Sequence, residues 1–329
     1  MGGGESLQFQ LNDWVTIVQL LVLIFLCINF LLIATFFSKV YFYTTMRYIL
    51  FAVTLLSDSS ILIMSNNLLI LSYFRFTMQI GLCVIIYIHL VLCTFVTPVT
   101  LTAMTLERYV AICMPLRHGE LCSTRNSINC ILIIHSLSSV PCIVVLSMFF
   151  ASVPHSLYTQ YSICSMGMFV FLRWQNNVKL AVYQCYFLIM TVTIIFSYSK
   201  IMKVVKAATG EDKKSTWKGL RTVALHGFQL LLCLIQLWCP FIETAVLQIN
   251  LKLFIDVRYF NYIMFNLTPR CLSPLIYGLR DDKFLLALKR NAPFGFPCVK
   301  SIYCFRDFHR GTVCYCNYND KCPRRLPPP

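Results

Sequence analysis

Charged residues are scarce in this chain, and their scarcity excludes an ordinary soluble protein. Only 12% of the 329 residues are charged, whereas 58% are hydrophobic. Soluble domains contain about 25% charged residues. Between Phe76 and Leu106 no Asp, Glu, Lys or Arg occurs at all. This composition indicates a membrane protein, because long apolar runs match the hydrocarbon core of a bilayer.

The sequence also lacks the motifs of common enzymes and the features of a transporter. It contains no HExxH, no GxSxG and no paired carboxylates, so nothing indicates an enzyme, a metal centre or a cofactor. A small transporter or channel predicts inverted repeats or several charges along a path. No internal repeat is present, and only Asp58 and Arg270 lie deep within apolar stretches. A transporter stays as an alternative with little to favour it.

Seven stretches are long and apolar enough to cross a bilayer, which takes about 20 mostly apolar residues. Each is expected to be a helix, because the bilayer core offers no partner for open backbone groups. The stretches, called spans 1 to 7, are Val15–Phe37, Tyr48–Phe74, Gln79–Ile112, Ile128–Ala151, Leu180–Ser199, Thr222–Ile242 and Tyr259–Leu279. The sequence therefore predicts an all-α membrane protein, a seven-transmembrane helix bundle with a short amphipathic helix after span 7.

The distribution of basic residues predicts how the chain is oriented. Residues 1–14 contain no Lys or Arg, whereas most of the 28 lysines and arginines follow spans 1, 3, 5 and 7. Basic residues favour the cytoplasmic side. We therefore expect a short extracellular N-terminus (1–14), a seven-transmembrane domain (15–291) and a cytoplasmic tail (292–329), in the plasma membrane. The net charge of +15 then reflects this bias and attraction to anionic lipids, and not nucleic-acid binding, which needs a basic patch on a reading fold.

The 17 cysteines do not form a disulfide framework. Many lie within spans, where cysteine is a small packing residue. Only Cys83, at the outer end of span 3, and Cys164, between spans 4 and 5, are both clearly on the oxidising side, which predicts a Cys83–Cys164 disulfide. The tail carries further cysteines without a paired CxxC module, so we expect disorder there and no zinc site. Palmitoylation of Cys298 or Cys304 is the alternative.

An acid and a base stand side by side where the long third span ends. They are Glu107 and Arg108, within the stretch MTLERYVAICMPLRH from Met104 to His118. An Arg at this depth is costly unless it is paired or hydrated, and Glu107 supplies a local partner. Such a pair can be a latch that opens in another state, or a simple anchor at the interface. The neighbouring motifs favour the first interpretation.

Four motifs stand at the ends of the spans. They are ERYVAIC followed by PLRH, Ser197-Tyr198 in span 5, KGLRTVALH from Lys218 to His226, and Ser273-Pro274-Leu275-Ile276-Tyr277 in span 7. Taken together, these motifs resemble a rhodopsin-like (class A) G-protein-coupled receptor of the odorant receptor family, most closely the fish-type odorant receptors. The resemblance covers roughly Leu20 to Lys289. It departs from the family pattern at Ser273, where Asn is usual, and in span 6, where two alignments differ by about one turn.

The resemblance implies a ligand-driven switch. A small-molecule odorant would bind between spans 3, 5, 6 and 7, and a heterotrimeric G protein of the cAMP-raising olfactory type would then meet Arg108; arrestin is a further implied partner. His226 could instead only cap a helix end. A non-odorant class A receptor is the alternative function. The implied switch residues are Glu107, Arg108, Tyr109, Tyr198, His226, Pro274 and Tyr277.

The expected ligand pocket is lined by eight residues, each of which could instead only pack helix on helix. The four on span 3 recur at i, i+3, i+4 and i+7 and so share one helical face. No Asp or Glu lies on this face, which disfavours a receptor for amines, because a bound cation wants a buried carboxylate. The residues are Tyr87, Leu90, Val91 and Thr94 of span 3, Val182 and Tyr186 of span 5, and Ile263 and Asn266 of span 7.

Arg270 lies within span 7, one turn outward of the Pro274 motif. An unpaired Arg at the bilayer centre costs at least about 2.5–3.5 kcal/mol on insertion scales. The other charge at similar depth is Asp58 in span 2, at the position where the resemblance implies a bound sodium ion. We therefore expect Arg270 to pair with Asp58 in place of the ion. Contact of Arg270 with backbone carbonyls and water is the alternative.

Overall fold

A computed structural model describes residues 2–170, 172–208 and 227–273, together with residues 284, 286–288, 304–307 and 311–314. The chain divides into two compact units, Met1–Asn291 and Ala292–Pro329. Four expected features lie largely or wholly outside the described residues: His226, Pro274, Tyr277 and the amphipathic helix after span 7, of which only the helical positions 284 and 286–288 are described.

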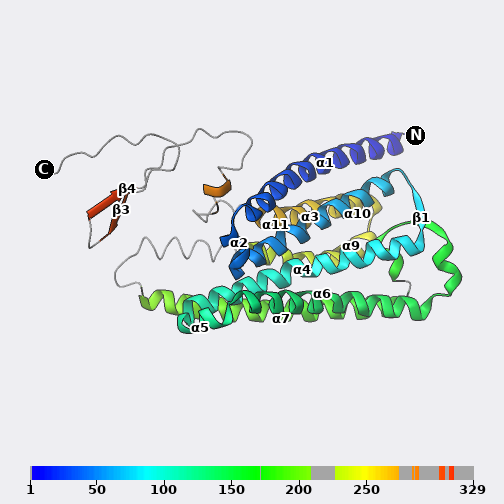
Figure 1. Cartoon of the computed structure of the whole chain (residues 1–329). Helices are drawn as coiled ribbons and strands as arrows, with labels where there is room; N and C mark the ends of the chain where they lie inside the picture. Colours follow the sequence, from blue (N-terminus) through cyan, green and yellow to red (C-terminus); the bar gives the residue numbers. More distant parts are fainter. Residues whose placement is uncertain are drawn as a thin grey trace. The chain divides into compact units, whose positions relative to one another are not determined.

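Unit 1 is an array of long helices that run roughly along one another (Figure 1). Within the described part of the chain, six segments are apolar and long enough to cross a membrane: Val15–Phe37, Met46–Tyr73, Ile80–Cys113, Arg125–Ser152, Arg173–Val204 and Gly227–Leu247. The seventh expected span is helical from Leu251 to Ser273, where the described part of it ends. The helices are α1 (Gly2–Phe37), α2 (Val40–Thr44), α3 (Met46–Tyr73), α4 (Ile80–Cys113), α5 (Pro115–Leu121), α6 (Thr124–Ser152), α7 (Arg173–Ala208), α9 (Cys239–Leu247), α10 (Leu251–Asn261), the π-helical η3 (Tyr262–Leu267) and α11 (Thr268–Ser273).

Several helices extend beyond the expected spans. Span 5 is expected over Leu180–Ser199, but α7 runs from Arg173 to Ala208. Residues 2–14, which belong to the expected N-terminus, are already helical, because α1 begins at Gly2. The expected limits follow the apolar run, which ends at the bilayer surface. A helix satisfies its backbone internally, so it can continue into water where polar residues begin.

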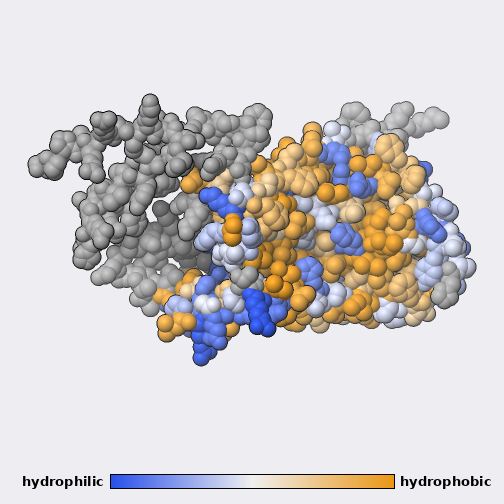
Figure 2. All heavy atoms as spheres, viewed as in Figure 1, coloured by the Kyte–Doolittle hydropathy of each residue, from blue (hydrophilic) through white to orange (hydrophobic). Residues whose placement is uncertain are grey.

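The surface of the bundle is apolar along the helices. Figure 2 shows hydrophobic residues over their long sides and hydrophilic residues gathered near α5. On α7 the side chains of Ile189 and Val192 are 67% and 65% exposed. Such a surface matches lipid acyl chains, because in water a contiguous apolar patch of this extent is rare for a soluble monomer.

Helix α4 forms the centre of the bundle and packs against α3, α6 and α7. Its inward residues include the fully buried Phe95, Leu101 and Met104. Polar threonines are tolerated inside because their hydroxyls bond to carbonyls one turn earlier; Thr102 donates to the carbonyl of Pro98 over 2.8 Å. Pro98 itself has no backbone N–H to donate, so α4 lacks one ladder bond at its middle.

The helical backbone is irregular in two places, before α9 and within η3. Before α9 the helix tightens, with Trp238 N–H donating to the Ile235 carbonyl over 2.8 Å. Pro240, at the first turn of α9, explains this, since it supplies no N–H for the preceding turn. In η3 the turn is widened instead, and the Thr268 hydroxyl reaches back five residues to the Ile263 carbonyl. π-Helical turns of this kind are frequent at functional sites.

A small sheet closes one end of the bundle, called here the disulfide end. Strands β1 (Thr77–Gln79) and β2 (Tyr161–Ile163) pair antiparallel, with Met78 opposite Ser162. The turns η1 (His155–Thr159) and η2 (Met166–Phe169) flank β2. This arrangement brings the long connection between α6 and α7 back to the start of α4.

Unit 2 contains a hairpin of two strands, β3 (Cys304–Asp307) and β4 (Gly311–Cys314), paired antiparallel with Cys304 opposite Cys314. The expected disorder of residues 292–329 stays a prediction, because the structure describes only the two strands of this hairpin there. The remaining residues of the tail lie outside the described part of the chain.

Candidate ligand-binding site and switch

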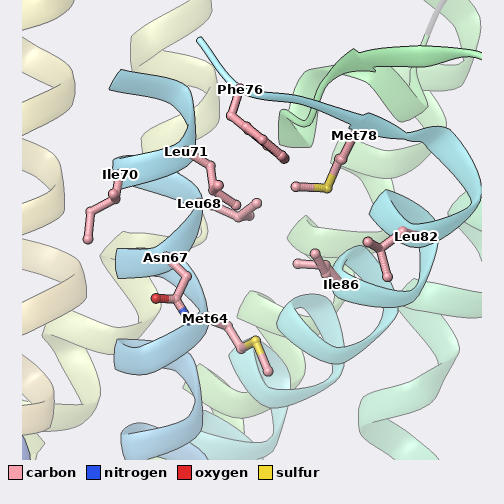
Figure 3. A pocket seen from close by; sticks show the side chains of 9 residues that line it. All are labelled: Met64, Asn67, Leu68, Ile70, Leu71, Phe76, Met78, Leu82 and Ile86. Atoms are coloured by element: carbon pink, nitrogen blue, oxygen red, sulfur yellow. The ribbon is translucent and has the colours of Figure 1, made fainter. Parts of the chain in front are cut away.

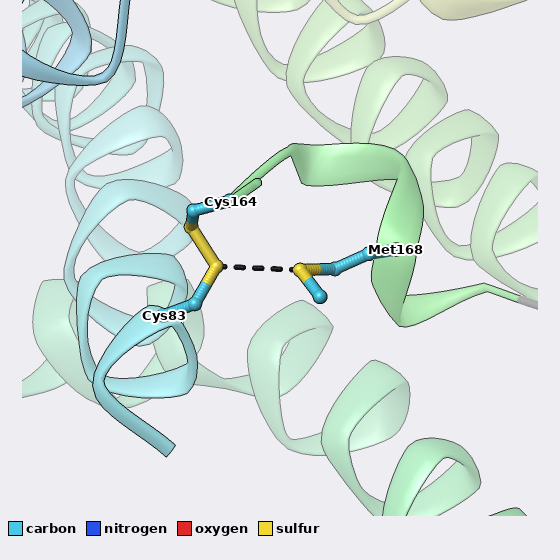
Figure 4. The surroundings of a disulfide bond; sticks show 3 residues. All are labelled: Cys83, Cys164 and Met168. Carbon is cyan, nitrogen blue, oxygen red and sulfur yellow. Dashed lines mark hydrogen bonds between the residues drawn. A yellow bond between two sulfur atoms is a disulfide. The ribbon is translucent and has the colours of Figure 1, made fainter. Parts of the chain in front are cut away.

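The connection between α6 and α7 is covalently tied to α4. Cys83, 1% exposed, and Cys164, 8% exposed, form the expected disulfide, with Cα atoms 5.7 Å apart. The sulfur of Met168 lies 3.4 Å from the Cys83 sulfur, as Figure 4 shows. The bridge joins residues that are 81 positions apart in the sequence. Because η2 begins just after Cys164, the bridge also holds η2 over the first turns of α4.

Below the disulfide the side chain of Phe169 covers Tyr87. Their ring centroids are 4.1 Å apart, and Phe169 also lies edge-on to Phe149 of α6 at 5.1 Å. Both Phe169 and Tyr87 are buried, at 1% and 4% exposure. Sequence reasoning identified Tyr87 but missed Phe169. The available signal was its position five residues after Cys164, which the disulfide holds over span 3.

An aromatic cluster joins α4 to α7 further along the bundle. Phe95 of α4 lies edge-on to Tyr183 at 4.9 Å and to Tyr186 at 5.1 Å. The Tyr186 hydroxyl donates to the carbonyl of Leu137 on α6. Periodicity selected Tyr186 but not Phe95 or Tyr183, because the face of span 3 that was chosen passes beside Phe95. We call Tyr87, Phe95, Phe169, Tyr183 and Tyr186 the aromatic cluster.

The other expected pocket residues do not all share one face. Val91 belongs to the same buried core as Phe95, whereas Leu90 packs with Ile61 of α3. The half-buried Thr94 donates its hydroxyl to the Leu90 carbonyl over 2.7 Å, and Val182 is half-buried on α7. The helical stripe i, i+3, i+4, i+7 is about 100° wide, so its two edges meet different neighbours.

On span 7 the two expected pocket residues meet other partners. Ile263 packs against a cluster of α1 and α3 residues that includes Val22 and Leu62. Asn266 accepts hydrogen bonds from Arg270 through both its backbone carbonyl and its side-chain oxygen. The structure thus places both residues toward α1, α3 and Arg270.

A cavity of about 410 Å³ lies near the disulfide end, between α3 and α4. Figure 3 shows its walls, which are apolar apart from Asn67. None of the eight expected pocket residues lines it. The lining residues are Met64, Asn67, Leu68, Ile70, Leu71, Phe76, Met78, Leu82 and Ile86.

The interior on the α3 side of α4 is charged. Asp58 is completely buried and Arg270 is 2% exposed, and Arg270 Nε lies 3.6 Å from Asp58 Oδ1. The Thr97 hydroxyl donates to the same carboxylate oxygen over 2.8 Å, and Arg270 Nη1 donates to Asn266. The guanidinium of Arg270 therefore contacts both the Asp58 carboxylate, as expected, and a backbone carbonyl, that of Asn266, as in the alternative. Multiple partners are what a buried ion pair requires, because desolvation of two charges costs several kcal/mol per ion.

The end of the bundle at α5 holds the described residues that are expected to form the switch. Glu107 accepts a hydrogen bond from His118 Nε2 on α5 over 3.2 Å. Arg108 and Tyr109 are half-buried, and the ring of Tyr109 lies 5.9 Å from Phe196 of α7. Sequence reasoning paired Glu107 with Arg108 and missed His118, although PLRH was among the motifs. The short helix α5 brings His118 back to the end of α4, beside Glu107.

Two further features complete the α5 end. The ring of Tyr198 lies against Gly227. A Cβ atom added to Gly227 would lie 3.4 Å from Tyr198 Cε2, so span 6 approaches α7 closely at this point. Cys122, just after α5, lies near Glu107 and His118. Its burial, and to a smaller extent the Glu107 carboxylate, raises the pKa of the Cys122 thiol above its ordinary value.

A loop bonded to the third of seven spans, with an acid–base pair at the far end of the same span, is the arrangement of a rhodopsin-like receptor. Residues 28–277 match the family described as 7 transmembrane receptor (rhodopsin family), and the chain belongs to this family. It is therefore a multi-pass membrane receptor and not an enzyme.

Individual members of this family show which receptors the chain is similar to. The chain is 43% identical to Odorant receptor 131-2 of Danio rerio over 284 residues, which is 86% of this chain and 87% of that protein. It is 28% identical to Olfactory receptor 1073 of Rattus norvegicus over 204 residues, 57% of this chain and 60% of that one. Similarity extends to the Green-sensitive opsin of Oryzias latipes, at 26% over 152 residues, 44% of this chain and 42% of the opsin.

Proposed function

We propose that this protein is an odorant receptor of the plasma membrane that activates a heterotrimeric G protein when a small odorant binds. The observation that carries the proposal is the 43% identity to a zebrafish odorant receptor across 86% of the chain. The ERY motif at Glu107–Tyr109 and the seven-span family match are in keeping with it.

The odorant binds in the region of the aromatic cluster, beside Val91, Thr94 and Val182. This region supports the proposal because aromatic side chains offer a large apolar surface to a small odorant. Their preference for offset and edge-on arrangements also favours some ligand shapes over others. Between Ile80 and Leu106 of α4 the sequence has no acid. A cationic amine is therefore disfavoured as the ligand, since it would be buried without a counter-charge.

Binding is transmitted along α4 to Arg108, which meets the G protein at the α5 end. That end faces the cytoplasm and the N-terminus faces outside, as the basic residues after spans 1, 3, 5 and 7 favour. His226, Pro274 and Tyr277 take part with Tyr198 in opening the α5 end, and arrestin and membrane lipids are further partners. An odorant shifts the equilibrium only by as much as it binds the open state better than the closed one.

The test is a panel of neutral odorants applied to cells that carry the receptor and a cAMP reporter. We expect at least one odorant to raise cAMP above the level in mock-transfected cells, and an N-terminal tag to be stained on intact cells. A receptor that reaches the surface, ignores the panel and answers a peptide or an amine would instead be a non-odorant class A receptor. Staining of the N-terminal tag only after permeabilisation would overturn the orientation.

A further inference from the structure

Three different metal-ligating side chains converge at the α5 end. They are Glu107 near the end of α4, His118 within α5 and Cys122 immediately after α5. A carboxylate oxygen, an imidazole nitrogen and the thiol sulfur all lie within 4.8 Å of one another. All three residues are half-buried, so the cluster is sheltered but reachable from solvent.

The local fold explains why these side chains meet. Met114 ends α4 with φ −136° and ψ 57°, and Pro115 starts α5 in a new direction. His118 and Cys122 are four residues apart, and the Cys122 N–H donates to the His118 carbonyl over 2.9 Å, so they occupy successive turns on one face. That face is turned toward Glu107, whose Oε1 lies 3.2 Å from His118 Nε2.

We propose that Glu107, His118 and Cys122 form a Zn²⁺ site. Zinc takes nitrogen, sulfur and carboxylate ligands in tetrahedral sites, with Zn–N and Zn–O bonds of about 2.0–2.2 Å. Two such ligands in a tetrahedron lie about 3.3 Å apart by that geometry, close to the observed Glu107–His118 separation. A thiolate and an imidazole also select against Mg²⁺ and Ca²⁺, which take oxygen ligands.

The charges of the ligand set favour a divalent ion in this basic environment. One carboxylate and one thiolate balance the two charges of Zn²⁺, so the loaded site is neutral beside Arg108 and Arg117. Binding transfers the thiol proton to solvent, because the thiolate is the metal ligand. Three protein ligands leave the fourth position to water.

Zinc at this site ties α5 to the residue that precedes Arg108. Since Glu107 would then be held by the metal, the α5 end of α4 becomes stiffer and its opening is opposed. We expect loaded zinc to lower G-protein activation by odorant. This consequence rests on the proposed function, whereas metal binding itself does not.

Zinc binding is tested on the full-length receptor in lipid nanodiscs, titrated with Zn²⁺ against a chelating dye. The tail carries further cysteines, so the readout is the difference between variants that share the same tail. In Cys122→Ser and in His118→Ala we expect one bound Zn²⁺ per receptor to be held at least about tenfold more weakly. Tenfold is the lower end of the loss in metal affinity when a site loses only a residue that supports its ligands. Cys185→Ser, on the exposed surface of α7, and His135→Ala, on α6, are matched controls that keep it.

Co²⁺ in place of Zn²⁺ reports the ligand directly. The unmodified receptor and Cys185→Ser should show a thiolate-to-cobalt absorption that Cys122→Ser reduces by one equivalent. Equal zinc affinity and equal cobalt spectra in Cys122→Ser and the unmodified receptor would overturn the site and leave Glu107–His118 as a metal-free contact.

The regulatory consequence is tested in membranes that contain the receptor and its G protein. With zinc present the odorant response of the unmodified receptor should fall severalfold, and a chelator should restore it. The response of Cys122→Ser should not change. If zinc binds to the receptor but leaves the odorant response unaltered, the proposed regulation is wrong and the proposed zinc site still stands. A receptor that answers no odorant in any condition overturns the proposed function, and the nanodisc titration still decides the site.

Discussion

The two sides of α4 differ in the forces that hold them to their neighbours. Toward α3 and α11 the contacts are charged and directional: Asp58, Arg270 and Thr97 are linked at 2.8–3.6 Å. Toward α7 they are aromatic, with Phe95 lying edge-on to Tyr183 and Tyr186. A buried charge network has few alternative arrangements, because each broken contact leaves a desolvated charge. Aromatic packing can shift at smaller cost, which suits a ligand site.

Breaking the charged side should have the largest effect on stability. Arg270→Met leaves Asp58 buried without its counter-charge, and such losses cost about 3–5 kcal/mol. We expect surface expression to fall strongly. Arg258→Met, on the exposed surface of α10, is the matched control.

A second substitution sharpens this test. Adding Asp58→Asn to Arg270→Met removes the orphaned charge, so part of the lost expression should return. In the unmodified receptor, replacing sodium by another cation should leave odorant affinity unchanged, because Asp58 already pairs with Arg270. A marked sodium effect, or no recovery in the double variant, would contradict the pairing.

The disulfide end should show the next largest effect. Cys83→Ser or Cys164→Ser removes a bridge that closes a loop of 81 positions, and such bridges contribute about 2–4 kcal/mol. Each single variant should be retained inside the cell, and flow cytometry should find the double variant no worse. A double variant with twice the loss of either single would show that the two cysteines act independently.

Changes on the aromatic side should alter ligand response more than folding. Phe95→Leu removes two edge-on contacts, each worth about 0.5–1.5 kcal/mol beyond burial, while a similar volume remains. We expect the odorant concentration for half-maximal response to change severalfold at near-normal surface expression. Phe150→Leu, exposed on α6, is the control. An unchanged response would place the odorant elsewhere, for example in the cavity between α3 and α4.

Features set by strong, one-dimensional constraints could be predicted from the sequence. Bilayer thickness defines the spans, and the cost of buried charge pairs Asp58 with Arg270. Phe169, Phe95 and Tyr183 could not be selected, because many aromatic residues fit a helix interface equally well in sequence. His118 was missed for another reason: its place beside Glu107 depends on the change of direction at Met114 and Pro115, which periodicity does not encode.

The most direct test of the account is odorant-stimulated nucleotide exchange on the G protein, measured in vesicles with the unmodified receptor and with Arg108→Ala. Odorant binding should be nearly equal in both, because Arg108 lies at the opposite end of α4 from Tyr87 and Cys83. The account predicts exchange with the unmodified receptor and none above background with Arg108→Ala. Equal exchange in the two proteins would contradict the role of Arg108 as the switch residue.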